Sequence, residues 1–117
     1  MIDYYKRVLR KINSIKNKNK RAEKITFGYS VLGRKIEGLF FNFNKKETFI
    51  IQASIHAREY ITTSFLLKVA NVVAGCDEKT TCALPNLLFI FLSNPDGVML
   101  VKNGLKSVKN IHYNRFL

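Results

Sequence analysis

Two short apolar runs, with a helical pattern between them, constrain the fold of this chain more than any other feature. Thr48–Ala53 and Leu87–Leu92 are nearly continuous apolar runs, typical of strands buried on both faces of a sheet. From about Arg58 to Ala74 the apolar residues recur at helical spacing, and Gly75 is a suitable helix stop. Strand, helix and strand in this order predict a crossover between parallel strands. We therefore expect an α/β fold with Thr48–Ala53 as a central strand.

The segment before these runs predicts a helix and a hairpin. Apolar residues at three- and four-residue intervals indicate an amphipathic helix from Ile2 to about Ile15. The β-rich segments Ile25–Tyr29 and Lys35–Phe43 are joined closely enough, through Leu32–Arg34, to form a hairpin. We expect a mixed, largely parallel sheet that begins with this antiparallel hairpin and is flanked by helices.

Length and charge limit the class of protein. The chain has 117 residues and 47% hydrophobic content, enough for one small core, so residues 1–117 are expected to form a single domain with 1–20 as its N-terminal helix and linker. The net charge of +12 suggests a basic module that binds nucleic acid or an anionic polymer. Much of the excess, however, lies in the first 24 residues, where it is typical of a solvated helix face. We expect no nucleic acid partner and keep the basic binding module as an alternative.

No segment has the features of a signal peptide or a membrane span. The N-terminus is charged throughout, and apolar runs such as Leu87–Leu92 are too short for either role. We therefore expect a cytoplasmic location and no membrane partner. Cys76 and Cys82 are close enough in sequence for a small disulfide and would stay thiols in a reducing compartment.

The segment Ser54–Glu59 carries the chemistry. It leaves the first apolar run and enters the predicted helix, so His56 is expected in a loop and Glu59 in the first helical turn. Imidazole nitrogen and carboxylate oxygen are both zinc ligands. The His-x-x-Glu spacing is a weak signal by itself, because a glutamate in a first turn often only complements the helix dipole. Ligands of such sheets bind at the carboxyl ends of the strands, so Asn94–Gly97 is expected next to this segment.

Three segments in order give a resemblance to a family. Gly28–Ile36, Ile55–Ile61 and Ser93–Val98 resemble successive signatures of the carboxypeptidase A-type zinc carboxypeptidases. The resemblance runs from about Tyr5 to the last residue, and its most specific element is the His-Ala-Arg-Glu-aromatic-Ile string. It implies the N-terminal portion of that fold and a zinc-dependent peptide hydrolase.

The resemblance also implies roles for individual residues. His56 and Glu59 match two of the three Zn²⁺ ligands, and Arg58 matches a contact to the carboxylate of a peptide substrate. Asn94–Gly97 is carried over as a turn that shapes the floor of the site, without a role in proton transfer.

A finer resemblance concerns the substrate. Asn94–Val98 and Asn103–Leu105 are most similar to the bacterial branch that cleaves γ-D-glutamyl-diaminopimelate bonds of cell-wall stem peptides. An ordinary carboxypeptidase specificity stays open.

The resemblance ends before the rest of the family's active site. Its third zinc ligand and its general-base glutamate lie farther downstream, so we assign no catalytic residue and expect the chain to be inactive alone. His112 follows the Asn94–Gly97 turn too soon to match the third ligand. Arg115 is a candidate substrate-binding arginine. A pseudoenzyme that scaffolds a partner is a further alternative.

Overall fold

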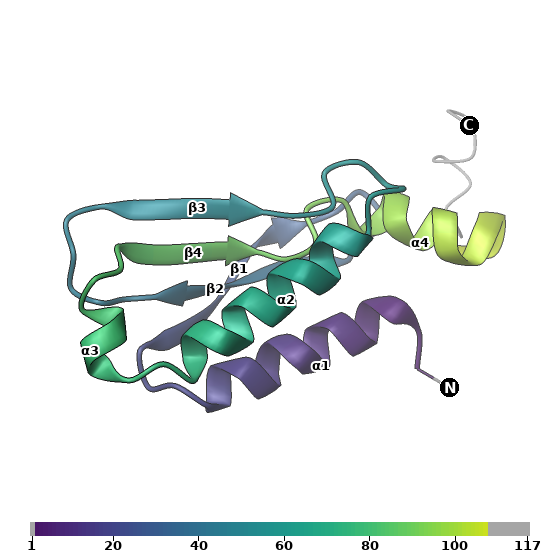
Figure 1. Ribbon diagram of the computed structural model, residues 1–117. Coiled ribbons are helices and arrows are strands. Elements are labelled where there is room, and N and C mark those ends of the chain that lie inside the picture. Colours follow the sequence, from purple (N-terminus) through teal and green to yellow (C-terminus); the bar gives the residue numbers. More distant parts are fainter. Residues whose placement is uncertain (1, 108–117) are drawn as a thin grey trace.

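The computed structural model describes residues 2–107 and shows a four-stranded sheet with helices packed on it (Figure 1). The elements in chain order are α1 (Tyr4–Asn17), β1 (Ala22–Tyr29), β2 (Lys35–Phe41), β3 (Thr48–Gln52), α2 (Ile61–Ala74), α3 (Glu78–Thr81), β4 (Asn86–Ile90), α4 (Pro95–Asn103) and the 3-10 helix η1 (Gly104–Ser107). The expected α/β class is confirmed, as are the N-terminal helix and the hairpin.

The strands are ordered β1-β2-β4-β3, and the sheet is mixed. β1 and β2 form the predicted antiparallel hairpin, β2 also pairs antiparallel with β4, and β3 pairs parallel with β4. Within residues 2–107 only one of the three pairings is therefore parallel, and the expectation of a largely parallel sheet does not hold for this part. The reason is that the hairpin joins the sheet through β2, which runs opposite to β4.

β3 lies at an edge of the described sheet and not at its centre, as its apolar run predicted. Phe49 and Ile50 are 57% and 63% exposed. β4 takes the central position, between β2 and β3, and its Phe89 is fully buried. The first run contains the polar residues Thr48 and Gln52, whereas Leu87–Leu92 contains none. The apolar content of a strand reports what the strand can bury and not whether a second neighbour lies beside it.

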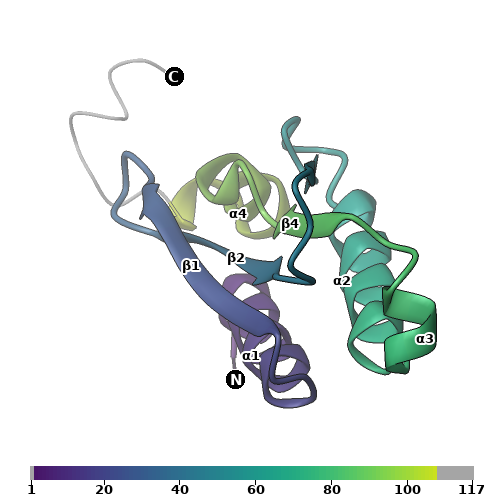
Figure 2. The same cartoon turned by 90° about the vertical axis from the view of Figure 1, so that its left-hand side faces the viewer.

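One face of the sheet is covered by α1 and α2, which lie side by side (Figures 1 and 2). α1 buries Val8, Ile12 and Ile15, at the four- and three-residue spacing that predicted it. These side chains belong to the same core as Phe41 and Phe89, whose rings meet edge to face at 5.7 Å. No helix within residues 2–107 is both long and apolar enough to cross a bilayer.

Gly38 allows β2 and β4 to approach closely. A Cβ atom added at this position would lie 2.0 Å from the carbonyl oxygen of Phe89, and 2.7 Å from the ring of Phe27. A larger residue would therefore push the two central strands apart.

α4 is a helix where the sequence predicted only a turn. Asn94 is its N-cap, with a side-chain oxygen that accepts a hydrogen bond of 3.0 Å from the amide of Gly97. Pro95 occupies the first turn, which its fixed φ favours, and Asp96 is an acidic residue in the same turn. Asn-Pro-Asp is thus a helix-start signal, since the turn continues into an apolar helical segment.

α3 fills the loop between α2 and β4. Its N-cap is Asp77, whose carboxylate accepts a hydrogen bond of 2.8 Å from the Thr80 amide, and this bond lowers the pKa of Asp77. Cys76 and Cys82, on either side of α3, are free thiols.

Candidate metal site at the carboxyl edge of the sheet

Backbone hydrogen bonds join the segments that leave β3 and β4. The Ala53 amide donates to the carbonyl of Ile90, and the amides of Ser93 and Asn94 donate to the carbonyls of Ala53 and Ser54, each at 3.0 Å. The side-chain amide of Asn94 donates to the carbonyl of Ile55 at 3.3 Å. The segments Ser54–Glu59 and Asn94–Gly97 are therefore neighbours, as predicted from their positions after parallel strands.

A tight turn holds His56 and Glu59 close together. The amide of Glu59 donates to the carbonyl of His56 at 3.0 Å, which closes a four-residue turn around Arg58. The Glu59 carbonyl accepts from the amide of Thr62 at 3.1 Å and from its hydroxyl at 2.7 Å. α2 therefore begins at Ile61, and Glu59 precedes the helix instead of lying in its first turn.

The loop that carries His56 is anchored at both ends by hydroxyl side chains, of which those of Ser54 and Thr63 are buried. Ser54 has φ of 55°, a strained value for a residue other than glycine, and is 2% exposed. Its amide donates to the hydroxyl of Thr62 at 2.9 Å, and its hydroxyl bonds that of Thr63, which donates to the carbonyl of Phe91. These bonds tie the exit of β3 to the start of α2. These bonds were not predicted from the sequence, although Ser54, Thr62 and Thr63 stand beside apolar segments in it.

His56 and Glu59 supply donors of the type that zinc accepts. Both side chains are exposed, as is Arg58 between them. Within residues 2–107 no group of three His, Cys, Asp or Glu side chains could hold a metal ion. The two donors stand at the ends of one closed turn and have the chemistry of zinc ligands, and the structure offers no third donor beside them in this range. His112 and Arg115 lie outside the described residues.

An aromatic pair fixes the residue that follows Glu59. The Tyr60 and Tyr4 rings meet edge to face at 6.2 Å, and the Tyr4 hydroxyl donates to the Tyr60 carbonyl at 3.4 Å. The Lys102 ammonium lies 4.1 Å from the Tyr60 ring centre and 4.4 Å from that of Tyr4. Burial raises the pKa of Tyr4. The end of the turn is thereby held against α1 and α4.

Asp96 connects two of the three segments that carry the family resemblance. Its carboxylate accepts from the Arg34 guanidinium at 2.8 Å, the Ser30 hydroxyl at 2.8 Å and the Leu32 amide at 3.0 Å. Asp96 is 7% exposed, so this ion pair is largely shielded from water. The residue was expected only to shape a turn, and the structure shows that it binds the hairpin turn to α4.

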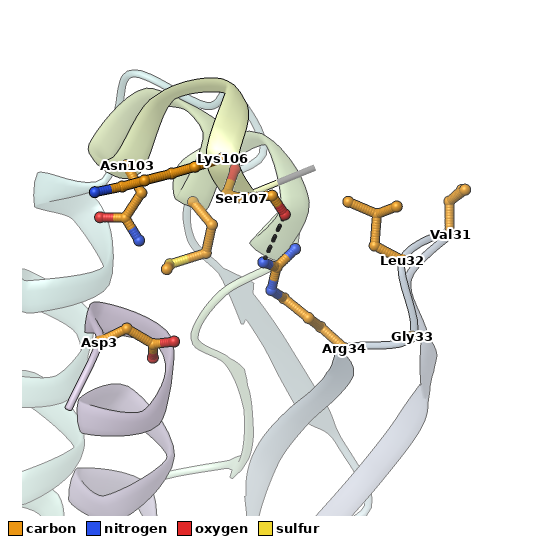
Figure 3. A pocket seen from close by; sticks show the side chains of 9 residues that line it. Asp3, Val31, Leu32, Gly33, Arg34, Asn103, Lys106 and Ser107 are labelled. Carbon is orange, nitrogen blue, oxygen red and sulfur yellow. Dashed lines mark hydrogen bonds between the residues drawn. The ribbon is translucent and has the colours of Figure 1, made fainter. Parts of the chain in front are cut away.

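A separate cavity lies away from the candidate metal ligands. It has a volume of about 820 Å³ between the hairpin turn and the α4–η1 segment, and Figure 3 shows Arg34 reaching across it toward Ser107. The guanidinium donates to the carbonyl of Ser107 at 3.4 Å. No residue of 54–59 lines this cavity, so it is separate from the candidate metal ligands.

The fold and the donor pair define an α/β protein whose candidate metal ligands follow a strand at the carboxyl edge of the sheet. The family model for zinc carboxypeptidases matches residues 8–115. The chain therefore belongs to the zinc carboxypeptidase family. No curated protein matches its sequence significantly.

Solved carboxypeptidase structures share the fold. Bovine thrombin-activatable fibrinolysis inhibitor, solved in complex with a tick carboxypeptidase inhibitor, is similar with a TM-score of 0.73 and 21% identity over 89% of this chain. Carboxypeptidase A from Helicoverpa armigera is similar with a TM-score of 0.58 and 19% identity over 89% of this chain. The chain spans 35% and 25% of these two structures, respectively.

Proposed function

We propose that this chain supplies His56 and Glu59 as two zinc ligands of a carboxypeptidase that hydrolyses peptides. The observation that carries the proposal is the closed turn, in which the amide of Glu59 bonds the carbonyl of His56 at 3.0 Å. This turn keeps the backbones of His56 and Glu59 close together, and both side chains, an imidazole and a carboxylate, are exposed, so we infer that they can bind one ion. Membership of the zinc carboxypeptidase family supports the identity of the metal.

Zinc bound at such a site polarises a carbonyl group and activates water as a nucleophile. The residues of this chain would hold the metal ion and orient the substrate. Ser54, Thr62 and Thr63 fix the ends of the loop, which limits the positions that the two donors can adopt. Arg58 is exposed in the same turn, and its planar guanidinium suits a substrate carboxylate. A third donor and a general base have to come from outside residues 2–107.

For the substrate, we propose peptides with a γ-D-glutamyl-diaminopimelate bond. The resemblance of Asn94–Val98 and Asn103–Leu105 to the bacterial branch that acts on such peptides supports this class. Asn94 lies beside the candidate ligands, because its side chain bonds the carbonyl of Ile55.

Calorimetric titration of zinc into the chain tests the ligand assignment. Both cysteines are replaced by serine throughout, so that thiolates do not compete for the metal. We expect weak binding, because two donors make an incomplete site, and we expect His56→Ala to weaken it by at least about tenfold, since even loss of an outer-shell partner costs 10–100-fold.

The matched control is Arg58→Gln, which changes the same turn without removing a donor. It should leave zinc affinity within about twofold of the parent, because arginine is not a zinc ligand. Equal affinity of the parent and His56→Ala would remove His56 from the site, and a large loss in Arg58→Gln would show that the titration reports turn structure instead of ligation. Circular dichroism of each variant separates both results from unfolding.

A further inference from the structure

The layer formed by α1 and α2 carries positive charge without any negative charge. Neither helix contains an aspartate or a glutamate. Their basic residues are Lys6, Arg7, Arg10, Lys11 and Lys16 on α1 and Lys68 on α2. The two helices lie side by side on one face of the sheet (Figures 1 and 2), so these basic residues belong to one layer of the molecule.

A groove runs between the two helices. It consists of two cavities of about 160 and 230 Å³ that share Lys11, Ser64 and Leu67 in their walls. Arg7 and Lys102 line the first cavity, and Lys68 lines the second. The groove therefore presents cations along its length, together with serine hydroxyls that can donate hydrogen bonds.

Protein carboxylates do not neutralise these cations in the described structure. Its ion pairs join Arg21 to Glu78, Lys24 to Glu37 and Arg34 to Asp96, all away from the groove. Lys102 and Arg7 are instead held by aromatic rings: Lys102 between Tyr60 and Tyr4, and Arg7 with its guanidinium carbon 6.0 Å from the Tyr4 ring centre. Such contacts position a cation without cancelling its charge.

We propose that the α1–α2 groove binds the backbone of a linear polyol phosphodiester polymer. At 1.5 Å per residue, Arg7, Lys11 and Lys18 follow one another along the helix at intervals of about 6 and 10 Å. Lys18 lies at the Asn71 end of the groove, where its ammonium donates a hydrogen bond of 2.5 Å to the side-chain oxygen of Asn71. A row of spaced cations matches a chain of spaced phosphates better than a single small anion.

The one aromatic side chain that lines the groove, Tyr4, argues against a single-stranded nucleic acid as the occupant. Proteins that bind single strands through their bases offer free rings for stacking. The Tyr4 ring already contacts Tyr60 and Lys102. No residue of the groove belongs to the His56–Glu59 turn, so this binding is independent of the proposed metal site.

Fluorescence anisotropy with a labelled glycerol phosphate oligomer of about eight phosphates tests the proposal in the full chain. Three phosphate contacts predict that log K falls with log salt with a slope of about −2. The double variant Lys11→Gln/Lys68→Gln should weaken binding at least about tenfold at low salt, because it removes both central cations of the groove. Lys46→Gln/Lys79→Gln, an equal change of net charge at exposed positions away from the groove, should change it less than about twofold.

Four results would overturn the proposal. The first is the absence of binding at low salt. The second is an equal loss of affinity in the two double variants, which would show that binding depends only on net charge. The third is at least about tenfold tighter binding of an oligothymidylate with the same number of phosphates, which would identify the occupant as a nucleic acid. The fourth is binding to vesicles of anionic lipid without binding to the oligomer, which would identify it as a membrane surface.

Discussion

At the level of single residues, Asp96 holds together segments that are more than sixty positions apart in the chain. Its carboxylate binds the guanidinium of Arg34, the hydroxyl of Ser30 and the amide of Leu32. Removal of the carboxylate leaves the Arg34 charge and the Leu32 amide without their partner in a part-buried region. Such losses are costly because the remaining groups were desolvated for a bond that no longer forms.

We predict that Asp96→Ala lowers the free energy of unfolding by about 3 kcal/mol, the lower end of the cost of breaking a buried ion pair. Urea denaturation followed by circular dichroism measures this change. Glu47→Ala removes the same charge from an exposed position without an ion pair among the described residues, and it should change the free energy by less than about 0.5 kcal/mol. Similar losses in both variants would show that Asp96 acts through net charge.

The position after two parallel strands was enough to place Asn94 beside the segment that carries His56 and Glu59. The choice of these two residues as candidate ligands came from the family resemblance, because the His-x-x-Glu spacing is a weak signal by itself. The sequence did not reveal that Glu59 precedes α2, because this depends on Thr62 capping the Glu59 carbonyl at 2.7 Å. Such caps depend on three-dimensional geometry that composition and periodicity do not encode.

At the level of elements, periodicity predicted α1, the hairpin and both apolar strands with few errors. It failed where an element's surroundings decide its place. β3 and β4 both have mostly apolar sequences, yet β4 lies between two strands and β3 at an edge. α4 was missed because its start signal, Asn-Pro-Asp, was interpreted only as a chain-breaking turn.

The edge position of β3 predicts self-association. Ile50 is 63% exposed on a strand that lies at the edge of the sheet formed by residues 2–107, a combination that favours pairing between chains. We expect the sedimentation coefficient of the chain to rise with concentration, and Ile50→Lys to suppress the rise. The charge opposes edge-to-edge pairing, and the high exposure of position 50 keeps its effect on folding small.

Val31→Lys is the matched control for this experiment. It adds the same charge at a hairpin residue that is 78% exposed and distant from β3 in the sheet order. Sedimentation velocity should show that this variant associates like the parent. A parent that stays monomeric at every concentration, or a control that dissociates as readily as Ile50→Lys, would contradict the role of the β3 edge.

At the level of the whole molecule, apolar surface extends beyond β3. Ile61, Phe65 and Val72 on the outer side of α2 are each 68–70% exposed, and Phe27 on β1 is 42% exposed. Exposed apolar residues in this number are typical of surfaces that other polypeptide covers.

The most direct test of the account is anomalous diffraction at the zinc absorption edge from crystals of the chain grown with zinc. We predict an anomalous peak with a ring nitrogen of His56 and a carboxylate oxygen of Glu59 each about 2.0–2.2 Å away. A peak at Cys76 or Cys82 with none at His56, or side chains of His56 and Glu59 that point to opposite sides of the turn, would contradict it.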